Sequence, residues 1–404
     1  MGLGLIDFFY TYSKQMAIFC GLLFVFLFYV KRNDVFVSFL YLIYAVSFFS
    51  TAFLLINSAK VLNFFSVVYL LLILPIFFDP FKVKNRSMIV TSSSLKQLKL
   101  LADVFVAFCA PAVLFYGYYA YLTLTTLDLS VVRLDYSFIL PHNILNTVFA
   151  GFSTLYFIPL VLYFCFLKYD IYPKYRIFLL FSTLSYPLLT LCYAGRDGVL
   201  FWVMNFIVLY FFFRSDIRQN KSTKKLLRVV TILVSFFVLA FLTISIARFS
   251  TTVKGPAYSF VGYMGQQSIH FSNTFNMDYW LGKGSIFPGI RRMFGLRTYG
   301  LDMSDYAALG ILEEYNVFSF FVGTIVRFYG KFGGFVIAFL FMLITRFYVS
   351  SYSRSGAVID LLIVFMLFQI PMNGVFYYRQ SVGSGDVIYA LFWLAAVVYK
   401  KIKL

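Results

Sequence analysis

The chain has 404 residues, of which 61% are hydrophobic and 22% aromatic, while only 12% are charged. Soluble domains carry charge on roughly 25% of their residues, so the composition excludes an ordinary soluble protein and predicts an integral membrane protein. The formal net charge of +18 is typical of lysines and arginines that flank membrane spans on the cytoplasmic side. It does not require nucleic acid as a partner.

The predicted elements are helical membrane spans, because a helix needs about 20 apolar residues to cross the hydrocarbon. Runs such as Met16–Val30, Val61–Phe78 and Val229–Ile246 approach or reach the range of about 17 to 25 residues found in such helices. We predict an all-α, polytopic membrane helix bundle of about eleven spans, or about twelve, that forms a single membrane domain over residues 1–404. In chain order, the windows are 16–30, 36–57, 61–79, 100–125, 144–167, 177–194, 198–213, 229–247, 333–349, 357–373 and 387–399.

The connections between these spans alternate between two sides, and basic residues crowd one side. Most of the 34 lysines and arginines fall there. They lie near residues 31–32, 82–99, 168–176, 214–228, 346–354 and 400–403. Because basic connections stay on the cytoplasmic side, we expect that side and the C-terminus to be cytoplasmic. Asp103 and Asp360 lie near the same ends, where helix capping accounts for an acid.

One connection, residues 249–332, is much longer than the others and should lie outside the cytoplasm. Its segments PAYSFVGYMGQQSIHFSNTFNMDYW and NVFSFFVGTIVRFYGKF are rich in aromatic and aliphatic residues, which disordered linkers lack. We therefore expect short amphipathic helices that lie on or dip into the outer face of the bundle. Loops of this length in compact proteins are usually functional.

A charged interruption, GRDG, separates the windows 177–194 and 198–213. Gly195 and Gly198 allow a tight reversal between helices, and helix amides after Gly198 attract anions. Arg196 beside those amides would form a phosphate cradle at the membrane boundary. The alternatives are neutralisation of Arg196 by Asp197, or a snorkelling arginine that caps the bundle.

A second boundary arginine, Arg248, ends the window 229–247 on the same predicted side as Arg196. Arginine forks match phosphate oxygens, so these two and the loop arginines predict an electropositive pocket that holds a pyrophosphate. The pyrophosphate-binding candidates are Arg196, Arg248, Arg291 and Arg292, followed by Arg297 and Arg327.

The GRDG turn, the single large external loop and the sequence NVFSFFVGTIVRFYGKFGGFVIAFLF resemble bacterial oligosaccharide repeat-unit polymerases of the O-antigen type. The resemblance is clearest over residues 186–341. Where many relatives have an arginine–aspartate pair, this sequence has Arg327 followed by Phe328. The resemblance implies a glycosyltransferase-C-like fold in the inner or plasma membrane of a bacterium.

It also implies an activity in O-antigen or capsular polysaccharide biosynthesis, on the outer face of the membrane. The growing glycan would pass from undecaprenyl pyrophosphate to the non-reducing end of an incoming repeat unit, itself linked to undecaprenyl pyrophosphate. Implied partners are this lipid-linked oligosaccharide, membrane lipids, a chain-length regulator and a flippase.

Such a transfer needs charge stabilisation of the pyrophosphate and a base for the acceptor hydroxyl. His270 is the first candidate for the base, because its ordinary pKa near 6.5 suits proton transfer at neutral pH. Asp278 and Glu313, with its neighbour Glu314, are rivals, and His142 is a weaker candidate. The sequence contains no metal-binding or nucleotide-binding motif, so we expect no metal and no other cofactor.

Three other functions remain open from the sequence. An O-antigen ligase would use the same donor but transfer it to a lipid A core. A flippase or exporter of lipid-linked sugars would show internal symmetry and several charged mid-membrane positions. A scaffold of envelope assembly would not need Arg196 or Arg248.

Overall fold

The computed structural model describes residues 2–56, 61–85, 92–126, 139–217, 235, 239, 242–243, 246, 255–276, 287–295, 319–377 and 385–402. Within these residues all regular secondary structure is helical, as the all-α prediction requires. Six of these helices are long and apolar enough to cross a membrane. The pair α6 (Ile144–Thr154) and α7 (Phe157–Lys168), bent by 51°, forms a seventh if it counts as one span.

The candidate spans correspond to windows predicted from the sequence. The six are Tyr12–Val30, Val35–Ile56, Phe64–Phe81, Leu98–Thr125, Asp197–Ile217 and Phe320–Ser355. Windows 177–194 and 357–373 coincide with shorter apolar helices, and window 387–399 lies within α17 (Gly385–Ile402). Nearly all of window 229–247 lies outside the described residues. The helices thus indicate a membrane protein, and the count of eleven spans stays a prediction.

The chain divides into two compact units. Unit 1 consists of Met1–Arg86 and Ala257–Leu404, and unit 2 of Ser87–Pro256. Each unit has its own buried core. The single membrane domain over residues 1–404 stays a prediction.

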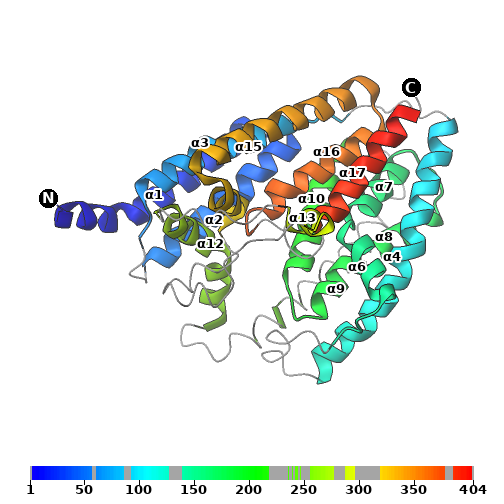
Figure 1. Ribbon diagram of the computed structural model, residues 1–404, viewed down its shortest axis with the longest axis horizontal. Coiled ribbons are helices and arrows are strands. Elements are labelled where there is room, and N and C mark those ends of the chain that lie inside the picture. The colour runs from blue at the N-terminus through cyan, green and yellow to red at the C-terminus, as the bar shows by residue number, and fades with distance from the viewer. Residues whose placement is uncertain are drawn as a thin grey trace. The chain divides into compact units, whose positions relative to one another are not determined.

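Unit 1 is built around aromatic side chains from helices that are distant in sequence. It contains α1 (Gly2–Val30), α2 (Val35–Ile56), α3 (Phe64–Phe78) with the 3-10 turn η1 (Asp79–Phe81), α15 (Phe320–Ser355), α16 (Val358–Asn373) and α17. Figure 1 shows α15 running along α3, where the rings of Phe77 and Phe341 are 5.1 Å apart. Tyr44 stacks on Phe320 at 5.3 Å and donates a hydrogen bond to the carbonyl of Pro371 at 3.0 Å. Helix α16 is buried on nearly every side, which explains why it is apolar all round.

Local signals set the ends of these helices. Asn63 caps α3 by accepting the N–H groups of Phe65 and Ser66 at 2.7 and 3.3 Å. Gly356 ends α15 in the left-handed conformation, with φ of 60°. Gly330 (φ 73°, ψ 175°) breaks α15 into two parts, close to the predicted boundary between the long loop and the next span.

Unit 2 surrounds α7 with helices α4 (Ser92–Thr126), α6, α8 (Tyr175–Ser182), α9 (Ser185–Leu191) and α10 (Asp197–Ile217). Figure 1 shows the long helix α4, in cyan, running beside α6, α8 and α9. Tyr156 and Tyr186 stack 4.8 Å apart, and the Tyr156 hydroxyl accepts a hydrogen bond from the Asn205 side chain at 2.6 Å. The buried indole N–H of Trp202 donates to Thr183 Oγ1 at 2.9 Å, so these two polar side chains of the core satisfy each other.

A basic cluster of unit 2, which includes Lys99 and Lys168, lies at one end of its helices. Lys168, at the end of α7, pairs with Asp216 near the end of α10 at 3.0 Å. At the start of α4, Asp103 accepts hydrogen bonds from Lys99 and from the hydroxyl of Tyr175, the latter at 2.6 Å. These contacts bring together the connections that the charge pattern places on the cytoplasmic side.

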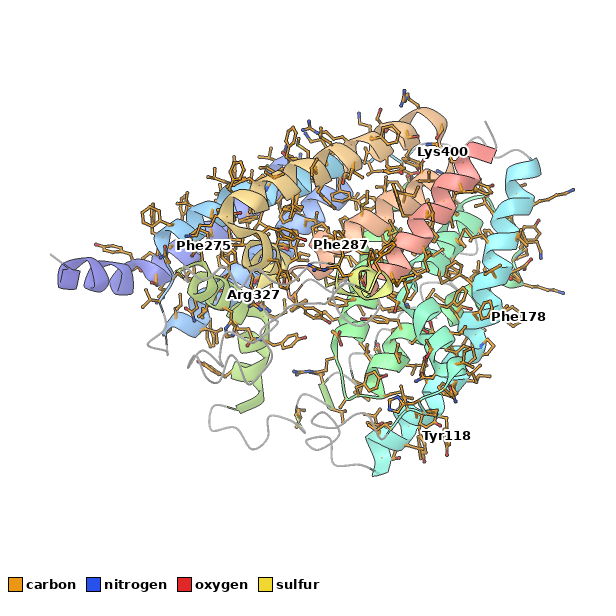
Figure 2. The ribbon with its side chains drawn as sticks, in the orientation of Figure 1. Tyr118, Phe178, Phe275, Phe287, Arg327 and Lys400 are labelled. Carbon is orange, nitrogen blue, oxygen red and sulfur yellow. The ribbon has the colours of Figure 1, made fainter. Side chains whose placement is uncertain are left out.

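Asp360 has a role beyond the predicted capping. Its side chain is fully buried and pairs with Lys400 of α17 at 2.8 Å. The hydroxyls of Ser351 and Ser355 donate to its other oxygen at 2.8 and 3.0 Å. Figure 2 labels Lys400 near the end of α17. A buried carboxylate needs such partners, so this cluster fastens α17 to α15 and α16.

Candidate functional site

Arg196 lies in the tight turn between α9 and α10 of unit 2. The turn closes with a hydrogen bond from the Gly195 N–H to the carbonyl of Thr190 at 2.8 Å. Ala194 adopts a positive φ of 51°, which is unfavourable for a residue with a Cβ atom. Backbone strain of this kind clusters at functional sites, so the turn is a candidate functional site.

Both glycines of the turn lie against Thr190. A Cβ atom on Gly198 would come 2.7 Å from Thr190 Cγ2, and one on Gly195 would come 2.9 Å from the Thr190 carbonyl oxygen. Neither position has room for a side chain. The pair of glycines in GRDG therefore follows from close packing of the turn on α9, as well as from the reversal that the sequence predicts.

The side chain of Arg196 is buried, with 4% of its surface exposed. The turn lies at the end of unit 2 opposite the basic cluster: Thr123, near the end of α4, donates a hydrogen bond to the carbonyl of Cys192 at 3.0 Å, whereas Lys99 and Asp103 lie near the start of the same helix. A buried guanidinium at this end is costly unless something compensates it. Arg196 is thus not a merely solvated surface charge.

One detail of the predicted phosphate cradle differs in the structure. Helix α10 begins at Asp197, so an acid occupies its first turn. A carboxylate there already interacts favourably with the helix amides. Asp197 Oδ1 lies 3.1 Å from the position that a Cβ atom on Gly195 would take, so the carboxylate folds back over the turn. An anion at Arg196 would therefore be held by the guanidinium more than by the α10 amides.

The long segment 249–332 contributes α12 (Gly255–Asn276), α13 (Pro288–Met293) and the first part of α15 to unit 1. The second half of α12 does not lie on a surface, as a short amphipathic helix would. Its residues from Gln267 to Ser272, which include His270 with 7% exposure, are all buried. Gln267, Ser268, His270 and Ser272 bring polar groups into this core.

Close contacts hold α12 in place. A Cβ atom on Gly265 would clash with the backbone of Ser50 and lie 2.5 Å from the Thr51 backbone nitrogen, so α12 crosses α2 with their backbones in contact. Thr51 and Ser47 of α2 donate hydrogen bonds to the carbonyls of Gly265 and Met264 at 2.7 and 2.9 Å. The Ser272 hydroxyl accepts the Asn63 N–H at 2.6 Å. His270 is therefore carried by a rigidly anchored helix.

Arg327 lies in the first part of α15, before the break at Gly330, and is half-buried. Just after the break, the carbonyl of Lys331 accepts a hydrogen bond from the Tyr69 hydroxyl at 2.7 Å, and the Lys331 ammonium lies 4.3 Å from the ring centre of Phe275. Figure 2 labels Arg327 and Phe275 in unit 1. Contacts from α3 and α12 thus hold the α15 break next to the α12 core.

The third piece, α13, carries Arg291 and Arg292. Arg291 is half-buried, and its Nε atom is buried with no hydrogen-bond partner among the described residues. Asp386, at the start of α17, accepts the backbone N–H of Ile290 at 2.9 Å. Asp386 is not among the site residues predicted from the sequence. An acid before an apolar run predicts the start of the helix that contains it. Nothing in the neighbouring sequence indicates that Asp386 instead caps a second helix, α13.

The predicted site residues thus fall into three groups. Arg196 belongs to unit 2, while His270, Arg291, Arg292 and Arg327 belong to unit 1. Arg248, Arg297, Asp278 and Glu313 lie outside the described residues. Their convergence on one pyrophosphate stays a prediction.

Over the part of the chain that the structure describes, no three His, Cys, Asp or Glu side chains gather as a metal site requires. The expected independence from metal is a prediction about the reaction and rests on the sequence. No protein-family profile, no curated protein and no solved structure matches the chain.

Proposed function

We propose that the protein is a lipid-linked oligosaccharide repeat-unit polymerase, a membrane glycosyltransferase that works without metal on the extracytoplasmic face. The observation that carries the proposal is the buried Arg196 in its tight turn, at the end of unit 2 opposite the basic cluster. A guanidinium held away from water interacts strongly with an anion. The apolar helices agree with a substrate that is itself embedded in the membrane.

The proposed reaction joins two lipid-linked glycans. A hydroxyl oxygen of the incoming repeat unit attacks the anomeric carbon of the growing glycan, and the bond from that carbon to the pyrophosphate oxygen breaks. The hydroxyl proton passes to a base, and undecaprenyl pyrophosphate leaves with the electron pair. Because this leaving group is already ionised, it needs positive charge more than a proton. Arg196 and the α13 arginines would supply that charge.

The buried position of His270 supports its assignment as the base. An imidazole in a water-poor core exchanges a proton with a bound hydroxyl rather than with solvent. The neighbouring Gln267 and Ser268 supply uncharged polar groups of the kind that hydrogen-bond sugar hydroxyls. Asp278 and Glu313 remain the rival bases.

The experiment uses purified protein in lipid nanodiscs and a lipid-linked repeat unit extracted from the source cells. A ladder of longer glycans on undecaprenyl pyrophosphate is the expected product. We expect Arg196→Ala to lower the rate about 100-fold or more, the usual effect of removing a group that stabilises developing negative charge. Arg196→Lys keeps the positive charge but loses the planar guanidinium, which can bind two phosphate oxygens at once, so this variant should retain part of the rate.

The matched control is Arg346→Ala, an exposed arginine of α15 that should leave the ladder unchanged. A wild-type protein that reacts only after lipid A core is added would indicate a ligase. An Arg196→Ala variant with wild-type ladder length and yield would remove the basis of the catalytic proposal and favour a scaffold.

A further inference from the structure

The position of α13 depends on a residue far away in the sequence. Asp386 is 3% exposed, and its Oδ2 atom accepts the N–H of Ile290 at 2.9 Å. Ile290 is the third residue of α13, where a helix N–H has no partner within the helix. The Asp386 carboxylate therefore caps α13 from another helix, because Asp386 belongs to the first turn of α17.

The contact is close as well as polar. A Cβ atom on Gly289 would lie 2.9 Å from Val387 Cγ2 and 3.2 Å from the carboxyl carbon of Asp386. Only a glycine lets the α13 backbone approach α17 this closely. Figure 2 labels Phe287, the residue that precedes α13, in this part of unit 1. α13 and α17 are thus locked at one point by Gly289, Ile290 and Asp386.

This contact does not use the side chain of the adjacent Arg291. No ion pair joins Asp386 to Arg291 among the described side chains, and the buried Nε of Arg291 has no hydrogen-bond partner there. The Oδ1 atom of Asp386 is also buried and unpartnered within the described residues. A carboxylate that binds the backbone of α13 fixes the helix and keeps the Arg291 guanidinium available for another anion.

The other end of α17 is also fastened. Lys400 pairs with the buried Asp360 at 2.8 Å, and Trp393, in the middle of the helix, donates a hydrogen bond to the Tyr348 hydroxyl at 2.9 Å. α17 is therefore tied to α15 and α16 along its length. A helix held in this way is a rigid support for α13.

We propose that Asp386 is the positioning residue of the α13 arginine: by holding the Ile290 N–H, it presents Arg291 to the diphosphate of the lipid-linked substrate. The inference rests on the proposed function and extends it to a residue that does not itself touch the substrate. It assigns α17 the role of setting the distance and orientation of one phosphate-binding group.

The test measures binding of undecaprenyl pyrophosphate to the full-length protein in nanodiscs, with undecaprenol as the uncharged control lipid. We expect Arg291→Ala and Asp386→Ala each to weaken binding about tenfold, as the loss of one charge-assisted hydrogen bond does. Asp386→Asn should bind nearly as well as wild type, because its amide oxygen still accepts the Ile290 N–H. Undecaprenol binding should not change in any variant.

The double variant Asp386→Ala/Arg291→Ala distinguishes positioning from an independent contribution. If Asp386 acts through Arg291, the double variant binds no more weakly than Arg291→Ala alone. Hydrogen exchange at the Ile290 amide gives a second readout that does not depend on the ligand. It should speed up in Asp386→Ala and stay slow in Asp386→Asn.

The outcomes separate the two proposals. Wild-type protein that binds no undecaprenyl pyrophosphate and makes no ladder overturns the polymerase assignment, and the role of Asp386 with it. Wild-type binding that survives Asp386→Ala, or full additivity in the double variant, overturns only the role of Asp386. If Asp386→Ala does not fold, Gly289→Ala replaces it, because the added methyl displaces the carboxylate without removing it and should weaken binding in the same way.

Discussion

Thr190 gives the GRDG turn its requirement for glycine. A Cβ atom on Gly198 would come 2.7 Å from Cγ2 of the Thr190 side chain, and one on Gly195 would come 2.9 Å from the Thr190 carbonyl oxygen. Thr190 is itself fixed by a hydrogen bond from its hydroxyl to the carbonyl of Pro187 at 2.9 Å, so it cannot easily turn away. The packing at Gly195 and the packing at Gly198 therefore both constrain the segment that carries Arg196.

We therefore expect Gly198→Ala to lower the free energy of unfolding of the protein by about 1–3 kcal/mol, the usual cost of overpacking a core. Gly117→Ala is the matched control, since the nearest atom to its Cβ would be 3.9 Å away. Chemical denaturation in mixed micelles compares the two. Adding Thr190→Ala to Gly198→Ala should restore part of the stability. Equal stability of Gly198→Ala and Gly117→Ala would show that the turn tolerates a side chain.

At the scale of elements, α12 depends on the bare backbone of Gly265. The hydroxyls of Ser47 and Thr51 reach the α12 carbonyls only because the two helices are in backbone contact there. The same helix has a second glycine one turn earlier, Gly262, whose Cβ would meet nothing closer than Leu54 Cδ2 at 3.8 Å. The two positions differ in packing but not in helix propensity.

Gly265→Ala should push α12 away from α2 and expose His270, whereas Gly262→Ala should not. The measurement is modification by diethyl pyrocarbonate, read by mass spectrometry. The chain has 2 histidines, and the exposed His142 serves as the internal standard. In wild type and Gly262→Ala, His142 should react much faster than His270. If His270 stays protected in Gly265→Ala, the backbone crossing does not hold α12.

At the scale of the whole molecule, each unit separates its basic connections from its candidate site residues. In unit 2, the basic cluster and the Arg196 turn lie at opposite ends of α4. In unit 1, α17 meets α13 at its start and Asp360 near its end. Its 18 residues span about 27 Å at the usual helical rise, close to the thickness of the hydrocarbon core. The orientation inferred from charge stays a prediction.

Labelling with a membrane-impermeant thiol reagent tests that orientation. The background replaces the four buried cysteines, Cys20, Cys109, Cys165 and Cys192. Single cysteines at the exposed positions Lys84 and Lys174 should react only in inverted vesicles, because basic connections face the cytoplasm. Those at the exposed His142 and Phe294 should react in intact cells. Labelling of Lys174 and His142 from the same side would contradict the predicted topology.

Some of the candidate site could be read from the sequence because its signals are local. Two glycines around two charges predicted the reversal at Arg196, and the aromatic content of 249–332 predicted ordered helices there. Asp360 and Asp386 could not be assigned in this way. Their partners Lys400 and Ile290 lie 40 and 96 residues away, and no local pattern indicates which distant group a carboxylate will meet.

The sequence by itself determined that this is a helical membrane protein and where its basic connections lie, because hydrophobic length and charge are properties of short segments. Only the tertiary structure decided that α12 is buried rather than lying on a surface, that Thr190 crowds both glycines, and that Asp386 caps α13. Each of these depends on which backbones approach one another. That choice is made by the packing of whole helices, so it does not appear in any single stretch of the chain.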